Sequence, residues 1–561
     1  MRILSVLFFL FCASIMLAQP VHTSVDICGS GTTYSINAHE LWQGGGLGLS
    51  LSGQGLRVYM WEASNGSGSH PDTNNAQLAG RISIGNSFDG VSSHATEMAK
   101  IMVGQTGDST EGIAYNANLI SYQVGNFNAD IIQALASGME LSNHSYGTNW
   151  GWNNAGGSLF WWGLEEIDST EDYNFGRYNY EAAFWDSLHH ENPFFLAVKS
   201  SGNTRGETHS GSHSFYRSVG GSTSNYNVTN STANRDADGG ASGLDCLPSD
   251  VTAKNLLVVG AVNPLLNGWQ YTSDVVLRNN SNTGPTDDGR IKPDVVAGGN
   301  NTSQASAAVA GSLILLKEHF EDIYNRKPLG STLRALLCHT ADEAGENPGP
   351  DYRFGWGLVN AKRAAEHISN TNALQHIYED TLHNGDTIRF YFSGDSSALR
   401  FTLAWTDPEG TPVPFANSPS LLDNPSAMLI NDLDLKVYQL TDSSSFYPFT
   451  LDVQNPTFAA SKGVNSTDNV ERVQIIQAGK TWYVAEVSHK GSLQTNQAFS
   501  LLSTGARSLL YYNGSEWVTK SPSSQSAEAD MYIAPNSILT LSPGFQVHHF
   551  FIGANAHVKV Q

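Results

Sequence analysis

Five short blocks, far apart in the chain, contain the residue types that nucleophilic catalysis requires. In chain order they are a carboxylate, a histidine, a Ser-Tyr-Gly segment, an asparagine and a serine: Glu62, His94, Ser145-Tyr146-Gly147, Asn203 and Ser303. A nucleophilic serine needs a histidine to accept its proton and a carboxylate to orient the imidazole. An asparagine side chain and a backbone N–H at a helix start can stabilise the resulting oxyanion. The order acid, histidine, serine is one of the known orders of such a triad.

Each block is weak evidence by itself. A serine that opens a helix is usually an N-cap, and most of the 18 histidines are expected to be ordinary surface or core residues. Glu62 alone would be an ordinary, partly exposed carboxylate. Only the joint order of the blocks indicates catalysis.

Alternating strands and helices are expected to position these blocks. Short apolar runs predict buried strands at residues 56–61, 118–124, 194–200 and 255–262, and helices are expected between them at 97–103, 131–139 and 180–188. A helix over residues 303–324 begins almost wholly apolar and is expected to cross the domain interior, and another helix follows at 329–340. This alternation predicts an α/β domain with a mainly parallel sheet.

The second part of the chain has a different pattern. Short strands without helices are expected at residues 386–392, 399–405, 433–438, 470–476 and 481–487, which predicts an antiparallel β-sandwich. The expected organisation is therefore a signal peptide at 1–18, a catalytic domain at 19–370, a sandwich at 371–505 and a short β-rich extension at 506–561.

Several blocks resemble those of the subtilases, peptidase family S8. His94-Ala95-Thr96 resembles the family's His-Gly-Thr block, and Thr302-Ser303-Gln304-Ala305 with Val309-Ala310-Gly311 resembles its Gly-Thr-Ser-Met-Ala…Val-Ala-Gly block. Further similar stretches lie at 253–261, 289–297, 339–342 and 355–360, and residues 404–408 and 431–435 resemble the sandwich of some bacterial subtilases. The resemblance implies a subtilisin-like parallel sheet flanked by helices, followed by an antiparallel, jelly-roll-like β-sandwich.

The resemblance also implies roles for the five blocks. Ser303 corresponds to the nucleophile, His94 to the general base and Asn203 to the oxyanion donor. Ser145-Tyr146-Gly147 corresponds to the edge strand that pairs with the substrate backbone. The implied activity is that of a secreted serine-type endopeptidase that acts on polypeptides and needs no cofactor for its chemistry. The alternative is a catalytically impaired relative that binds a polypeptide or a surface partner.

Four departures from the family pattern favour that alternative. Glu62 stands where the family has Asp, and its extra methylene moves the carboxylate by up to about 1.5 Å. Glu97 and Lys100 replace a histidine and a glycine, and Asn301 and Ala307 replace a glycine and a proline. The segment before the nucleophile, residues 298–301, is short, so part of the substrate wall is expected to be missing. The stretch between the signal peptide and the domain leaves no room for a folding propeptide.

Charge and targeting signals limit the partners. A net charge of −22 argues against nucleic-acid binding. Residues 1–18, with Arg2 followed by an apolar run too short to span a membrane, predict export to the outside or the cell surface. A monomer without a membrane span is expected after removal of the signal. Cys28, Cys246 and Cys338 then allow one disulfide at most, with the pairing open.

A structural Ca²⁺ site is a further hypothesis. Asp432 and Asp434 lie close together in the predicted sandwich, and Asp407 or Asp468 could join them through folding. Carboxylates clustered in this way offer the oxygen ligands that Ca²⁺ prefers. A solvated acidic turn explains the same residues equally well.

Overall fold

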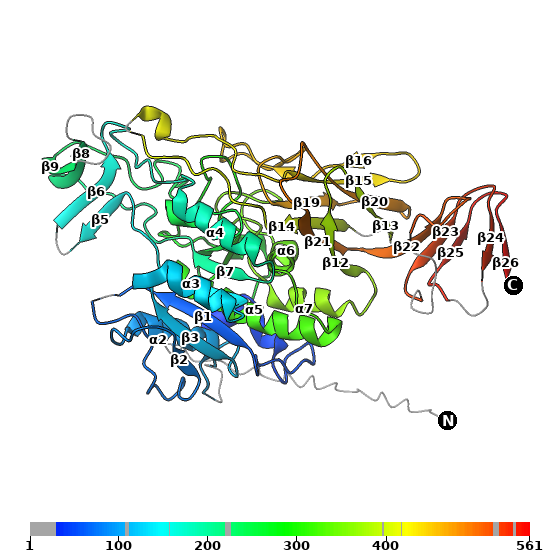
Figure 1. Ribbon diagram of the computed structural model, residues 1–561, viewed down its shortest axis with the longest axis horizontal. Helices are drawn as coiled ribbons and strands as arrows, with labels where there is room; N and C mark the ends of the chain where they lie inside the picture. Colours follow the sequence, from blue (N-terminus) through cyan, green and yellow to red (C-terminus); the bar gives the residue numbers. More distant parts are fainter. Residues whose placement is uncertain are drawn as a thin grey trace, which may run out of the picture.

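The computed structural model describes residues 30–64, 66–106, 111–155, 158–218, 226–394, 398–416, 418–519, 527–541 and 546–560. Its parts follow one another along the long axis of the molecule: a small β-sheet at one end, the α/β part, a β-sandwich, and a β-rich C-terminal part at the other end (Figure 1). The expected signal peptide and Cys28 lie outside the described residues.

A seven-stranded sheet forms the centre of the α/β part, with the strand order β11-β10-β7-β4-β1-β3-β2. Every pair of neighbours in it is parallel. The strands are β1 (Arg57–Glu62), β2 (Ile82–Ile84), β3 (Asn118–Gln123), β4 (Leu141–His144), β7 (Leu196–Ser200), β10 (Leu257–Val262) and β11 (Val295–Gly298). The predicted parallel α/β fold is confirmed.

Both faces of this sheet are buried. Alternate residues of β1 belong to different cores: Val58 and Met60 pack with α2 and α5, whereas Tyr59 and Trp61 pack with α3 and α4. The predicted interior helix is confirmed, because α5 is buried over most of its length. The helices are α1 (Ser30–Ser35), α2 (Ser93–Val103), α3 (Phe127–Ala136), α4 (Tyr180–Glu191), α5 (Thr302–Tyr324), α6 (Gly330–Thr340) and α7 (Ala361–Ser369).

The predicted sandwich consists of two sheets, with the orders β12-β21-β14-β19 and β16-β15-β20-β13-β22-β23-β25. Alternate residues of β15, Leu433, Leu435 and Val437, are buried in the core between the sheets. The strands are β12 (Gln375–Leu382), β13 (Ile388–Gly394), β14 (Leu399–Trp405), β15 (Leu433–Gln439), β16 (Ser445–Phe446), β19 (Val470–Ile475), β20 (Trp482–His489) and β21 (Gln497–Thr504). They pair in antiparallel fashion.

The C-terminal part continues the second of these sheets. β22 (Ala506–Tyr512) pairs with β13 in antiparallel fashion, and β23 (Asp530–Ile533) and β25 (Phe550–Ile552) then add in parallel. β24 (Ile538–Leu541) and β26 (His557–Val560) form a separate parallel pair. The expected limit at residue 505 therefore falls between β21 and β22, which belong to different sheets.

A small sheet at the other end of the molecule was not predicted. It consists of β5 (Trp152–Ala155), β6 (Ser158–Leu164), β8 (His213–Ser218) and β9 (Tyr226–Ser231). Its core is a cluster of three buried aromatic side chains, Trp152, Trp161 and Phe215. Because β6 and β8 are distant in the chain, no pattern of neighbouring residues predicts that they pair.

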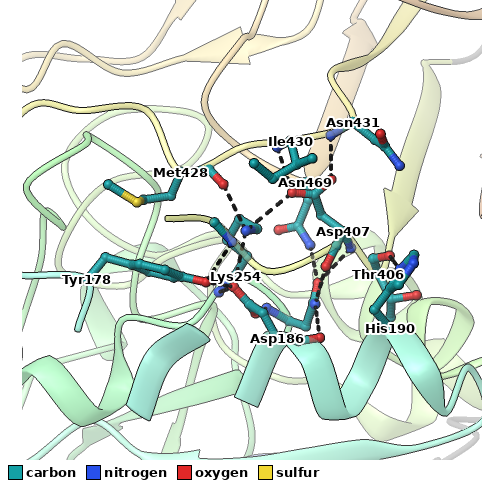
Figure 2. Close-up of polar contacts among 12 residues, drawn as sticks. Tyr178, Asp186, His190, Lys254, Thr406, Asp407, Met428, Ile430, Asn431 and Asn469 are labelled. Atoms are coloured by element: carbon teal, nitrogen blue, oxygen red, sulfur yellow. Dashed lines mark hydrogen bonds and ion pairs between the residues drawn. The ribbon is translucent and has the colours of Figure 1, made fainter. Parts of the chain in front are cut away.

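A buried network of charges joins the α/β part to the sandwich (Figure 2). Lys254 is fully buried, and its Nζ lies 3.2 Å from Asp186 Oδ2 on α4 and 3.3 Å from Asp407 Oδ2 beyond β14. The same ammonium donates a hydrogen bond of 2.8 Å to the carbonyl oxygen of Met428. Asp407 also accepts hydrogen bonds from the backbone N–H groups of Ile430 and Asn431. The Lys254 ammonium therefore forms an ion pair with one buried carboxylate from each of the two parts.

Replacing this cation should destabilise the protein strongly. Lys254→Met leaves Asp186 and Asp407 buried without their cation, which should lower the free energy of unfolding by about 3–5 kcal/mol. Lys480→Met, at an exposed position, is the matched control and should change it by less than about 0.5 kcal/mol. Urea denaturation followed by circular dichroism measures both values. Equal stabilities for the two variants would contradict the role given to Lys254.

Candidate active site

Four of the five predicted blocks lie at the carboxyl ends of strands of the central sheet. Glu62 is the last residue of β1, Ser145 follows β4, Asn203 lies just beyond β7, and Ser303 lies just beyond β11. Because these strands are parallel, their carboxyl ends meet at one edge of the sheet, the usual position of ligand sites in α/β folds. The fold thus gathers residues that are up to 241 positions apart onto one edge.

Glu62 and His94 are in direct contact. His94 lies in the first turn of α2, where the side chain of Ser92 caps the helix by accepting a hydrogen bond from the N–H of Ala95. His94 Nδ1 lies 3.0 Å from Glu62 Oε2. The longer side chain of glutamate therefore reaches the imidazole nitrogen that a triad carboxylate has to hold.

This contact affects the protonation of both residues. Burial raises the pKa of the Glu62 carboxyl, and the hydrogen bond with His94 opposes that shift. The hydrogen bond to Glu62 raises the pKa of His94 above its usual value, although partial burial acts in the other direction. The contact therefore stabilises a positively charged imidazole, the form that a general base takes after it accepts a proton.

Ser303 lies in the first turn of α5. Its Oγ donates a hydrogen bond of 3.2 Å to the carbonyl oxygen of Ser145, and within the described part of the chain it forms none with His94. Asn301 caps the helix by accepting a hydrogen bond of 2.9 Å from the N–H of Gln304. The structure thus joins Glu62 to His94 and joins Ser303 to the Ser145 segment.

Two amide donors beside Ser303 are free. Asn203 Oδ1 accepts hydrogen bonds from the N–H and the hydroxyl of Thr302, at 2.9 and 3.0 Å. Asn203 Nδ2 and the backbone N–H of Ser303 form no hydrogen bond with any described residue. The first N–H groups of an α-helix lack partners within the helix and carry partial positive charge. This corner can therefore accept an anionic oxygen.

The departure at Glu97 has a structural partner. Gln304 Nε2 donates a hydrogen bond of 2.8 Å to Glu97 Oε1. Glu97 lies one turn beyond His94, and Gln304 follows Ser303. The hydrogen bond therefore connects the first turns of α2 and α5, the two helices that carry the candidate base and nucleophile. The two residues lie too far apart in the chain for sequence reasoning to pair them.

The Ser145-Tyr146-Gly147 segment forms no strand pairing with the described residues. Lys199, a buried residue of β7, supports it from within. Lys199 Nζ donates a hydrogen bond of 3.0 Å to the carbonyl oxygen of Tyr146, lies 4.3 Å from the centre of the Tyr146 ring and lies 3.2 Å from Asp250 Oδ2. Sequence reasoning missed this residue. The only signal was a lysine inside a strand predicted to be buried.

The four aspartates considered for Ca²⁺ do not converge. Asp432 and Asp434 both face Lys490, whose Nζ lies 3.1 and 3.0 Å from their oxygens. Asp407 belongs to the Lys254 network. Asp468 accepts a hydrogen bond of 2.7 Å from the N–H of Ile291.

Cys246 and Cys338 are buried free thiols in the structure. Burial raises the pKa of each to about 12, so neither is a reactive thiolate at neutral pH.

Several known proteins are similar to parts of this chain. The model of the subtilase family matches residues 69–357. The serine protease/ABC transporter B family protein tagA of Dictyostelium discoideum is 24% identical over 278 residues, which are 40% of this chain. The chain spans 15% of the length of that relative.

Two solved structures are also similar to parts of the chain. The self-cleaved protease domain of PatA has 18% identity and a TM-score of 0.36, over 57% of this chain and 99% of that one. The MycP3 protease from the type VII (ESX-3) secretion system has 17% identity and a TM-score of 0.36, over 60% and 88% respectively.

The family match covers more than half of the chain. It begins after Glu62 and includes His94, Asn203 and Ser303 at the edge of the parallel sheet. This chain belongs to the subtilase family of proteases.

Proposed function

We propose that the protein is a secreted serine-type endopeptidase with Ser303 as nucleophile, His94 as general base and Glu62 as the residue that orients His94. The observation that carries this proposal is the pair of unused amide donors, Asn203 Nδ2 and the N–H of Ser303, beside a serine at the start of a 23-residue helix. Such donors stabilise an oxyanion during acyl transfer. The 3.0 Å contact between Glu62 and His94 supports the assignment of the base.

The proposed reaction runs in two halves. Ser303 Oγ attacks the carbonyl carbon of the peptide bond while His94 Nε2 accepts the hydroxyl proton, and the new oxyanion accepts hydrogen bonds from the two free amides. The C–N bond then breaks as His94 returns the proton to the leaving amine. Water, deprotonated by His94, then attacks the acyl carbonyl, and His94 returns this proton to Ser303 Oγ as the bond to the acyl group breaks. For the first half, the Ser303 hydroxyl must turn from the carbonyl oxygen of Ser145 toward the imidazole, a rearrangement that substrate binding commonly completes.

The polypeptide substrate is proposed to lie along Ser145-Tyr146-Gly147. This segment follows β4 and has no neighbouring strand among the described residues. The carbonyl oxygens of Ser145 and Tyr146 already accept hydrogen bonds from Ser303 and Lys199, so strand addition would use the other backbone groups of the segment. The chemistry needs no cofactor. Export as a monomer through a signal peptide at residues 1–18 is part of the proposal and rests on the sequence pattern alone. None of the helices in the described ranges has the length and apolar character of a membrane span.

A polypeptide-binding protein without turnover is the second candidate. Two observations favour it: Ser303 Oγ is hydrogen-bonded to the carbonyl oxygen of Ser145, and Glu62 Oε1 is buried without a hydrogen-bond partner among the described residues. The same segment, Ser145-Tyr146-Gly147, would then hold a peptide that is not cleaved.

Hydrolysis of an unstructured protein such as casein distinguishes the two candidates. The wild-type chain should cleave it, and Ser303→Ala should lower kcat by roughly 10⁶-fold because the nucleophile is lost. Ser312→Ala is the matched control on the same helix, since Ser312 only donates a hydrogen bond to the carbonyl oxygen of Val309, and it should retain activity. If the wild-type chain binds casein but cleaves it no faster than Ser303→Ala does, the result favours the second candidate.

The pH dependence of kcat/KM tests the role of Glu62. His94 must be neutral to act as a base, so activity falls as the pH drops through its pKa, which lies above the usual value because of the hydrogen bond to Glu62. Glu62→Gln should move this acidic limb to lower pH and lower kcat by about 10⁴-fold. If the acidic limb of the kcat/KM profile lies at the same pH in Glu62→Gln as in the wild type, Glu62 acts only in folding.

Glu62→Asp tests whether the site is built for glutamate. The shorter side chain withdraws the carboxylate by up to about 1.5 Å and opens the present 3.0 Å contact. Turnover should therefore fall by at least about tenfold, with the protein still folded by circular dichroism. Faster turnover in Glu62→Asp would mean that the extra methylene is a defect of this site.

A further inference from the structure

Four carboxylates converge beside the junction of the α/β part and the sandwich. They belong to Glu171, Asp245, Asp287 and Asp423. Carboxylate oxygens of Glu171, Asp245 and Asp423 all lie within 4.8 Å of one another. Glu171 and Asp245 come from loops of the α/β part, whereas Asp423 follows β14 in the sandwich part.

The fourth carboxylate points an unpartnered oxygen into the same space. Asp287 is 7% exposed, its Oδ2 accepts a hydrogen bond from the N–H of Asn424, and its Oδ1 is buried without a partner among the described residues. Asp245 Oδ1 is also buried without one. A Cβ atom on Gly176 would lie 2.1 Å from Asp287 Oδ1 and 3.1 Å from Asp245 Oδ1. The two oxygens therefore border one small space, which glycine at position 176 keeps open.

Among the described residues, no lysine, arginine or histidine forms an ion pair with any of the four carboxylates. The carboxyl groups of Asp245 and Asp423 share a hydrogen bond with each other. Arg177 donates from Nη2 to the carbonyl oxygen of Val413 instead.

Asp287 is buried, and Glu171 and Asp245 are half-buried. Unpaired carboxylates in such a position are costly unless a cation joins them.

We propose that Glu171, Asp245, Asp287 and Asp423 bind a Ca²⁺ ion. The donor set is all oxygen and strongly anionic, as Ca²⁺ prefers, whereas Zn²⁺ favours nitrogen and sulfur ligands. Oxygens of Glu171, Asp245 and Asp423 lie within 4.8 Å of one another, close enough for one ion to contact all three. Ca²⁺ accepts such a flexible set of oxygen ligands, whereas Mg²⁺ demands near-ideal octahedral geometry. A cavity of about 170 Å³, lined in part by Glu171 and Asp245, gives room for the waters that complete the shell.

The position of the site gives the ion a structural role. Because Asp423 belongs to the sandwich part and the other three residues to the α/β part, one ion holds the two parts together. It would act beside the Lys254 network, where a side-chain cation does the same. This site is separate from the Asp432–Asp434 pair, both of which form ion pairs with Lys490.

Thermal melts of the full chain in Ca²⁺ and in EDTA test the site. The wild type should melt about 2–4 °C higher when the ion is at 100 times its Kd. Asp245→Asn should lose this shift and, in EDTA, should melt above the wild type because one repelling charge is gone. Asp423→Asn, at an exposed position, should fold normally and weaken Ca²⁺ binding by at least tenfold in isothermal titration calorimetry.

Asp432→Asn is the matched control and should keep the full Ca²⁺ shift. The proposal is overturned if the wild type melts at the same temperature in Ca²⁺ and in EDTA. It is equally overturned if the shift survives in both Asp245→Asn and Asp423→Asn, and loss of the shift in Asp432→Asn alone would place the ion in the sandwich instead.

Discussion

The hydrogen bond between Glu62 and His94 is the interaction on which the proposed active site depends. The fold places Glu62 at the end of a strand that is buried on both faces, where a carboxylate without a partner is costly. His94 provides that partner and is itself oriented by it. The carboxylate must therefore remain in place for the imidazole to keep its orientation, and the longer glutamate side chain is compatible with this arrangement.

Buried charges with long-range partners recur throughout the molecule. Lys199 supports the Ser145 segment, Glu97 connects α2 to α5 through Gln304, and Lys254 joins the α/β part to the sandwich. Each contact links segments that are distant in the chain. The carboxylates around Asp245 differ, because they lie close to one another and no described basic residue forms an ion pair with them. A bound cation would explain this arrangement.

Features that depend on local patterns could be predicted from the sequence. The first strand was expected at residues 56–61 and is observed as Arg57–Glu62, and the long interior helix was expected at 303–324 and is observed as Thr302–Tyr324. Apolar runs and helical periodicity are properties of neighbouring residues, so they can be recognised in the sequence without knowledge of the fold. The parallel sheet and the sandwich followed from the order of such elements.

Features that depend on tertiary contacts could not be predicted in this way. The sheet of β5, β6, β8 and β9 requires pairing between distant segments. Asp432 and Asp434 suggested a cation site because they are close in sequence, yet Lys490, from another strand end, lies between their oxygens. The carboxylates around Asp245 were overlooked because they are scattered over more than 250 residues.

Labelling with a fluorophosphonate probe is the most direct test of the central claim, because the probe reacts only with a serine that a neighbouring base activates. Intact-protein and peptide mass spectrometry would locate the modified residue. We predict modification of Ser303 in the wild type and none in a folded His94→Ala variant. An unmodified Ser303 in the folded wild-type protein would contradict the claim that Glu62 and His94 activate this serine.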